Sequence, residues 1–158
     1  MDQQALAGAR ALIALHARVT LGLREMGVLR TRNAVGDFCE WLATETLQLK
    51  RMPPNATYDA EDANGLRYEI KSRQTTEGSS NELLGSTTTR FGKFKKDAFD
   101  KIVCVFINAR GDVTLAFQID HDDAVRLAYE AKNGYVLAAN AATLGDPAVT
   151  DLTQRFQL

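Results

Sequence analysis

The stretch that most constrains the fold is the apolar run KIVCVFI at Lys101–Ile107. Successive side chains of a strand point to opposite faces, so a strand that is apolar at almost every position must be covered on both faces. The turn sequence NARG follows at residues 108–111, and a second strand-length stretch occupies residues 112–119. We therefore expect a hairpin whose first strand lies in the middle of a sheet.

Helical patterns flank this hairpin. Apolar positions recur through residues 3–26, which predicts a helix that serves either as core packing or as a dimer face. A second helix is expected over residues 33–50 and a third over residues 121–132, with Asp122 as the N-cap of the third. A last short strand is expected at residues 135–137.

These elements predict an α/β fold with a mixed central sheet of about five strands flanked by helices. A chain of 158 residues fits one domain, with an N-terminal helix over about 3–26, a core over about 33–138 and a short C-terminal tail. The end of the tail either packs as a short helix or frays. The side of the second helix that we expect to be buried consists of Val35, Phe38, Leu42, Thr46 and Leu49.

Charge and cysteine usage limit the function. The chain carries 19 basic and 20 acidic residues, so its net charge of −1 gives no global attraction to nucleic acid, and any such surface must be local. We expect Cys39 and Cys104 to be reduced thiols in buried elements of a cytoplasmic protein. The first residues do not have the pattern of a secretion signal, and we expect no segment close to the about 18 apolar residues that span a membrane.

The segment YDAEDANGLRYEIKSR, residues 58–73, combines a turn with a charged strand face. Asn64-Gly65 favours the positive φ values of a tight hairpin, which would bring Asp59 back beside Glu69. Because strand side chains alternate, Glu69 and Lys71 share one face while the apolar residues between them face a core.

Two carboxylates that converge on one point repel each other unless a cation neutralises them. Oxygen ligands of this kind suit Mg²⁺ or Mn²⁺. Lys71 would then contact an attacking water or a phosphate oxygen. The alternative is an ordinary strand with a solvated charged face, in which Asp59, Glu69 and Lys71 lie far apart or fully in water.

Upstream of this segment, Glu40 lies within the second expected helix, flanked by apolar residues. A helix that carries an acid is thus followed by a strand that ends at Asp59, a turn, and a strand that bears Glu69 and Lys71. This order resembles the PD-(D/E)XK nuclease superfamily, which has the restriction-endonuclease-like fold. Tyr58 stands where the family often has a proline, and the strand expected at residues 112–119 is additional to the family core.

The resemblance implies a function and a set of site residues. It implies an Mg²⁺-dependent (or Mn²⁺-dependent) endonuclease-type hydrolase that cuts phosphodiester bonds in DNA. The implied catalytic residues are Glu40, Asp59, Glu69 and Lys71, and the implied metal ligands are Asp59, Glu69 and Glu40. The alternative is a catalytically inactive nucleic-acid-binding or regulatory module with the same fold.

Basic residues beyond the strand predict a local nucleic-acid surface. Residues 74–89 have the composition of a loop, and they lead into RFGKFKK at residues 90–96. The cations would contact phosphates while Phe91 and Phe94 stack on bases, or else both rings lie in the core and the lysines in water. The predicted nucleic-acid-binding residues are Arg73, Arg90, Lys93, Lys95 and Lys96.

The expected partners are therefore DNA and, as one possibility, a second copy of the chain bound through the N-terminal helix, with no membrane. His121 beside Asp122 and Asp123 suggests either a metal cluster or a helix cap, and we favour the cap because these residues lie where a strand passes into a helix.

Overall fold

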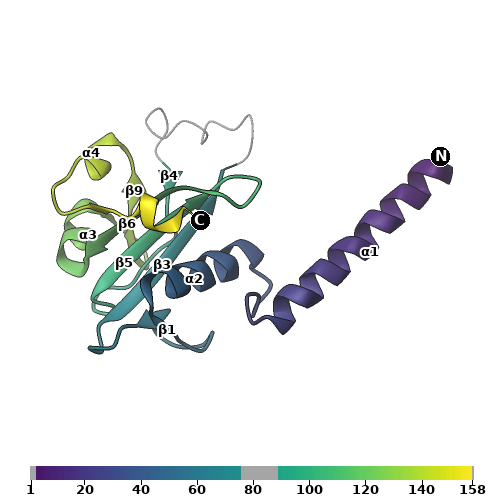
Figure 1. The fold of residues 1–158 in the computed structure, drawn as a ribbon. Coiled ribbons are helices and arrows are strands. Elements are labelled where there is room, and N and C mark those ends of the chain that lie inside the picture. Colours follow the sequence, from purple (N-terminus) through teal and green to yellow (C-terminus); the bar gives the residue numbers. More distant parts are fainter. Residues whose placement is uncertain (1–2, 76–88, 158) are drawn as a thin grey trace.

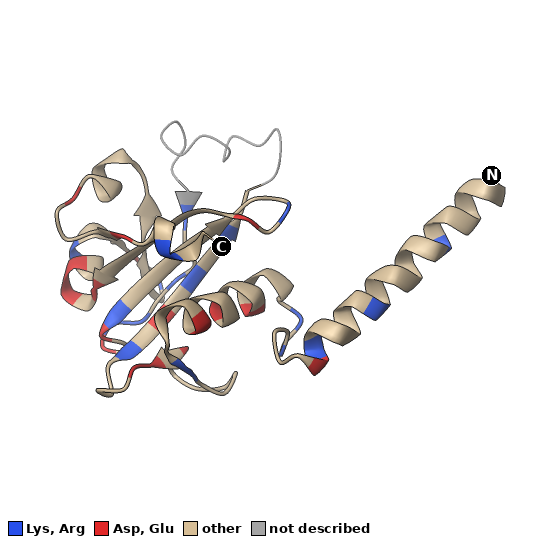
Figure 2. Cartoon of the chain, viewed as in Figure 1, with Lys and Arg blue, Asp and Glu red and all other residues tan. Residues whose placement is uncertain are grey.

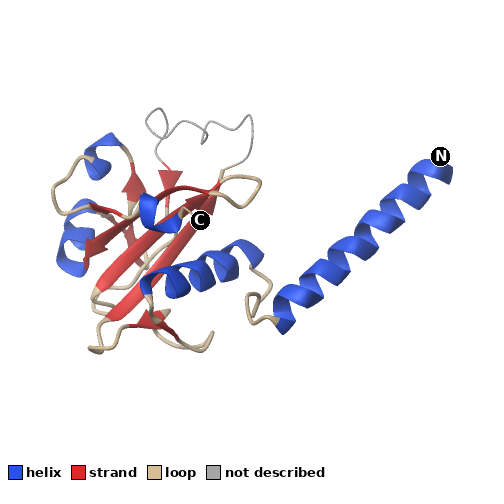
Figure 3. Ribbon diagram, in the orientation of Figure 1, coloured by secondary structure: helices blue, strands red, loops and turns tan. Residues whose placement is uncertain are grey.

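The computed structural model describes residues 3–75 and 89–157. Its centre is a six-stranded mixed sheet in the order β1-β2-β3-β5-β6-β10, beside which one long helix extends outward (Figures 1 and 3). The strands of this sheet are β1 Lys50–Arg51, β2 Ala60–Glu61, β3 Arg67–Gln74, β5 Lys101–Ile107, β6 Val113–Asp120 and β10 Thr150–Asp151. The mixed α/β fold is thus confirmed, although β1 and β10 are too short to leave a sequence pattern.

Strand β5 lies inside the sheet, as its apolar sequence predicts. It pairs in parallel with β3, from Tyr68↔Lys101 to Gln74↔Ile107, and antiparallel with β6. Residues 102–107 are all buried. The predicted β5–β6 hairpin is confirmed, and Gly111 supplies the left-handed turn position at φ +90°.

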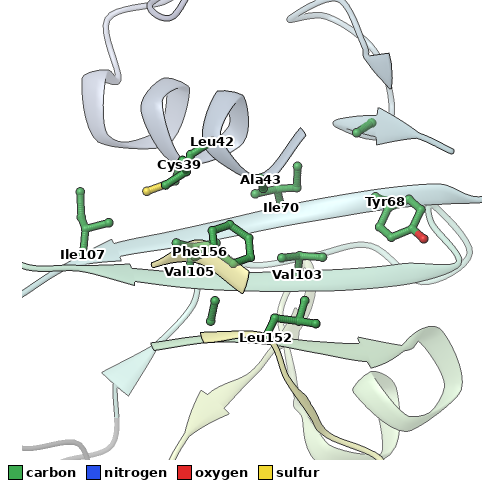
Figure 4. Close-up of a cluster of buried hydrophobic side chains, with 12 residues drawn as sticks. Cys39, Leu42, Ala43, Tyr68, Ile70, Val103, Val105, Ile107, Leu152 and Phe156 are labelled. Atoms are coloured by element: carbon green, nitrogen blue, oxygen red, sulfur yellow. The ribbon is translucent and has the colours of Figure 1, made fainter. Parts of the chain in front are cut away.

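Helix α2, Ala34–Leu47, covers one face of the sheet. It begins at Asn33, whose side chain accepts a hydrogen bond from the Gly36 amide, and it ends where Gln48 adopts the left-handed conformation, earlier than predicted. Figure 4 shows its Cys39, Leu42 and Ala43 against Tyr68 and Ile70 of β3 and Val103 and Val105 of β5. Its fully buried side is therefore rotated from the predicted one, since Val35, Phe38, Thr46 and Leu49 are only partly buried.

A second cluster, rich in phenylalanine, covers the other face. It contains Phe91, Phe94 and Phe99 together with Ile102, Cys104, Phe106, Phe117 and Ile119 of the sheet. The elements around it are β4 Thr89–Arg90, α3 His121–Leu127, β7 Tyr129–Ala131, β8 Gly134–Val136, β9 Ala138–Ala139 and α4 Ala141–Leu144.

The helix predicted over residues 121–132 was too long. It ends at Leu127, because residues 129–136 form the β7–β8 hairpin, in which Ala131 pairs with Gly134 across a turn of Lys132 and Asn133. The prediction of Asp122 as N-cap was also wrong. Asp120 occupies that position without a side-chain capping bond, since its carboxylate accepts a hydrogen bond from Lys101 Nζ instead.

The C-terminal tail packs against the sheet. Strand β10 pairs with β6, and the 3₁₀ helix η1, Thr153–Phe156, follows it. Leu152 and Phe156 are buried in the cluster beneath α2. Of the two sequence alternatives, packing is therefore the one that is observed.

Helix α1, Gln3–Glu25, extends away from the α/β body (Figure 1). None of its residues is buried, so it is not core packing. By length and composition alone α1 also meets the criterion for a membrane-crossing helix, contrary to the sequence expectation. A core helix or a signal sequence passes the same test, so this result does not locate the protein.

Shortening the Phe156 side chain should test how firmly the tail is packed. Phe156 is 3% exposed, so Phe156→Ala should lower the free energy of unfolding by about 3 kcal/mol through lost burial and a residual cavity. Urea unfolding followed by Trp41 fluorescence measures the change. Gln154→Ala, at an exposed position of η1, is the matched control and should change stability by less than about 0.5 kcal/mol. A loss below about 1 kcal/mol for Phe156→Ala would indicate a frayed tail.

Candidate active site

The predicted site begins at the β2–β3 hairpin. The Asp62 carboxylate accepts hydrogen bonds from the Asn64 and Leu66 amides, at 2.8 and 3.0 Å. Gly65 lies at φ +83°, which a residue with a side chain rarely adopts. The tight turn predicted from the sequence is therefore present, and it returns the chain from β2 to β3.

Asp59 lies at the start of this hairpin, directly before β2. Its amide donates to the Tyr68 carbonyl at 2.9 Å, and its Oδ2 accepts from the Ile70 amide at 2.7 Å. Asp59 therefore bonds to the backbone on both sides of Glu69, through its amide to Tyr68 and through its carboxylate to Ile70, as the hairpin argument predicts.

Glu69 and Lys71 share one face of β3. Lys71 Nζ donates to Glu69 Oε1 at 2.5 Å. The side chain of Lys71 is only 21% exposed and that of Glu69 only 14%. A solvated strand face would leave both groups in water. The ordinary-strand alternative therefore does not describe these two residues.

Glu40 projects from α2 and is held by two arginines. Its Oε1 accepts from Arg51 Nε at 3.0 Å and also pairs with Arg30 Nη2. The Arg51 guanidinium further donates to the carbonyls of Gly27, Val28 and Asp37. Sequence reasoning missed both arginines, because ion pairs between positions 10 and 11 residues apart follow no helical or strand period.

The three carboxylates interact electrostatically. Burial raises the pKa of Glu40, and the negative charge of Asp59 opposes its ionisation further, against hydrogen bonding and charge from Arg51. Burial likewise raises the pKa of Asp59, although the Ile70 amide and Lys71 lower it. The pKa of Glu69 is raised by burial and by the charges of Asp59 and Glu40, against the lowering by Lys71. The structure thus brings the four predicted catalytic residues into one interacting group.

These four residues do not by themselves form a complete metal site. In residues 3–75 and 89–157, no three His, Cys, Asp or Glu side chains are grouped so that they could hold a metal ion. Asp59 and Glu69 offer the hard oxygen ligands that Mg²⁺ prefers, and their mutual repulsion favours a cation between them. Glu40 fits less well as a ligand, because its carboxylate already pairs with Arg30 and Arg51.

The second acidic group of the sequence, at residues 121–123, makes structural contacts. His121 Nδ1 lies 2.9 Å from Asp122 Oδ1, and His121 Nε2 accepts a hydrogen bond from the Asp97 amide. Both ring nitrogens are thereby engaged at the junction of β6 and α3, which agrees with a structural role rather than metal binding.

Three of the predicted nucleic-acid-binding residues line the same pocket as Glu69. The pocket has a volume of about 580 Å³, and its lining includes Arg67, Glu69, Lys93, Lys95 and Lys96. Glu69 is 24 residues before Lys93 in the chain, so their meeting depends on the fold. Asp97 also lines the pocket, so four cations accompany two acids among the described residues there. Of the predicted catalytic residues, Glu69 is the one among the described lining residues.

The other two predicted nucleic-acid contacts lie elsewhere. Arg73, near the end of β3, donates to the Arg90 carbonyl at 2.8 Å, and the Arg90 guanidinium lies 5.6 Å from the centre of the Tyr129 ring. Phe91 and Phe94 are 1% and 2% exposed, so the suggestion that they stack on bases was wrong. Of the loop predicted over residues 74–89, residues 76–88 lie outside the described residues.

Neither the models of known protein families nor the curated proteins that were compared with this sequence give a match.

The raised pKa of Asp59 predicts a pH-dependent stability. The folded protein holds this proton more tightly than the unfolded chain does, so stability falls as pH rises above the ordinary value of 3.8. Asp59→Asn removes the buried charge and keeps an oxygen for the Ile70 amide. We expect it to raise Tm by about 2–4 °C at pH 7 and by less at pH 3.5.

Thermal unfolding followed by circular dichroism measures this difference. Glu130→Gln is the matched control, since Glu130 is an exposed acid of β7, and its Tm should equal that of the wild type at both pH values. A lower Tm for Asp59→Asn at pH 7 would mean that the ionised carboxylate stabilises the fold through its cationic neighbours.

Proposed function

We propose that this protein is a divalent-metal-dependent nuclease that hydrolyses phosphodiester bonds in DNA, built on the restriction-endonuclease-like fold. The observation that carries the proposal is the pocket in which Glu69 meets Lys93, Lys95 and Lys96. A carboxylate suits a metal ion and lysines suit phosphates, and a phosphodiester substrate needs both in one place. The resemblance of the Glu40, Asp59, Glu69 and Lys71 arrangement to the PD-(D/E)XK superfamily supports the same assignment.

The proposed roles follow from the contacts of each side chain. Asp59 and Glu69 would hold Mg²⁺ or Mn²⁺, with Glu40 contributing directly or through a water. When bound, the ion would polarise the phosphoryl group and lower the pKa of a coordinated water. Lys71, whose Nζ lies against Glu69, would orient the attacking water and stabilise charge that develops on the phosphoryl oxygens.

The lysines of the pocket would position the substrate. Lys93, Lys95 and Lys96 are exposed cations on a segment whose phenylalanines are buried in the core. This packing holds the lysines beside the pocket while leaving their ammonium groups in solvent. Contacts of this kind fix the register of a nucleic acid without reading its sequence.

Loss of the central pair should abolish cleavage. We expect Lys71→Ala and Glu69→Gln each to slow nicking of a supercoiled plasmid in Mg²⁺ or Mn²⁺ by about 100-fold or more, because each removes a group at the reacting phosphate. Gel electrophoresis of a time course measures the rate. Arg110→Ala, at an exposed position of the β5–β6 turn, is the control and should cleave like the wild type. Cleavage that survives both site variants would remove these residues from the mechanism.

The pocket lysines make a separate prediction about binding. Replacing Lys93, Lys95 and Lys96 together by alanine should weaken duplex DNA binding for all sequences alike, because phosphate contacts carry no base information. The slope of log affinity against log salt should become shallower by about 1 for each lysine that contacts a phosphate. Fluorescence anisotropy at several salt concentrations measures it, and an unchanged slope would place DNA away from this pocket.

A specific observation also favours the inactive module as a second candidate. Glu40 is paired with two arginines and Glu69 with Lys71, so the charges of these carboxylates are already partly balanced by protein cations. Calorimetry separates the two functions. Mg²⁺ or Mn²⁺ binding that Asp59→Asn abolishes supports the nuclease, whereas DNA binding that is indifferent to metal, with no cleavage, supports the module.

A further inference from the structure

Helix α1 presents an unusually apolar surface to solvent. Leu12, Leu15 and Val19 of α1 and Met26 directly after it recur at spacings of three, four and seven, which places them along one side of the helix and its C-terminal end. Their exposed fractions are 69, 54, 53 and 70%. An apolar face of this length on a helix with no buried residue marks an interaction surface.

The chain cannot cover this face by folding α1 back. After α1, Gly27 adopts φ +74°, and its amide and that of Val28 bond to the carbonyls of Arg24 and Leu23, which closes the helix with a Schellman-type turn. Val28 and Leu29 are then buried in the body, and Arg51 donates to the Gly27 carbonyl at 2.9 Å. The direction of α1 is thus fixed by the turn, and it points outward (Figure 1).

The body carries an apolar groove that is complementary to such a helix. It has a volume of about 570 Å³, and its floor and walls come from α2, the start of β6 and η1. Its apolar lining residues are Phe38, Trp41, Leu42, Val113 and Phe156. The exposed acids Glu45 and Asp112 lie at the same groove.

Charge complements shape in this pairing. Helix α1 carries Arg10, Arg18 and Arg24 against one acid, Glu25 (Figure 2). Arg18 lies beside the apolar stripe, whereas Arg10 and Arg24 lie on the opposite side of the helix. A helix that inserts the stripe would therefore bring Arg18 toward Glu45 and Asp112.

We propose that α1 of one copy docks in the groove of a second copy, and that the two copies exchange their helices. A twofold exchange forms the same contact twice, which doubles the buried area and leaves no groove open. A membrane span would place Arg10 and Arg18 within the hydrocarbon layer, which is costly. Docking in the groove avoids this cost.

Disulfide trapping in the full-length chain tests this arrangement. Thr46, a partly buried residue of the groove, is changed to cysteine together with Leu12→Cys, Leu15→Cys or Val19→Cys in turn. The native Cys39 and Cys104 are fully buried and should not react. We expect at least one of the three double variants to form a covalent dimer under mild oxidation, and none of the three single helix variants to do so.

Dimer formation by the single helix variants would overturn the proposal in favour of α1 packing on α1. Sedimentation of the unmodified chain adds an independent measurement. The wild type should be dimeric, and Glu45→Lys should raise the dimer dissociation constant by roughly tenfold. Glu130→Lys, an exposed acid outside the groove, is the matched control and should dimerise like the wild type.

A monomer at all concentrations tested would also overturn the proposal. So would a monomer that cosediments with vesicles containing anionic phospholipid, since α1 would then bind lipid rather than the groove. None of these outcomes depends on nuclease activity, so the proposal stands or falls separately from the proposed function.

Discussion

The guanidinium of Arg51 connects strand β1 to helix α2 and to the turn after α1. It bonds to the carbonyls of Gly27 and Val28 in the turn after α1, to the Asp37 carbonyl in α2 and to the Glu40 carboxylate. Its side chain is only 13% exposed, so these bonds replace most of its hydration. One residue of the two-residue strand β1 therefore sets the position of α2, the direction of α1 and the orientation of an acid near Asp59. A lysine could not make four such contacts, because it lacks the planar fork of donors.

Ionising the carboxylates of the candidate site costs free energy, which the rest of the fold offsets. Three carboxylates have raised pKa values because burial removes water from them, and part of the remaining cost is mutual repulsion. Proteins keep such groups where function needs them, since apolar replacements would be more stable. Two partly buried arginines and Lys71 limit the cost without removing it.

Local sequence patterns predicted the features that depend only on the backbone geometry of neighbouring residues. The Asn64-Gly65 turn, the shared face of Glu69 and Lys71, and the central position of residues 101–107 follow from backbone geometry and side-chain alternation. The pairing of Glu40 with Arg30 and Arg51 could not be predicted, because it depends on how α2 docks on the sheet. The helix expected over residues 121–132 was too long, because only the pairing of β7 with β8 shows that the chain turns back on itself after Ala131. The interleaved basic and aromatic residues at 90–96 allowed two interpretations, and the burial of Phe91 and Phe94 in the core decides against base stacking.

Both edges of the six-stranded sheet end in strands of only two residues, β1 and β10. A long exposed edge offers unpaired amides and carbonyls to any passing strand, and it can recruit further copies without limit. The two outermost strands themselves offer room for very few such bonds. Strand β2 covers only Arg67 and Tyr68 of β3, and β10 covers only Phe117 and Gln118 of β6. Addition of a further strand is therefore directed to the parts of β3 and β6 that these short strands leave uncovered.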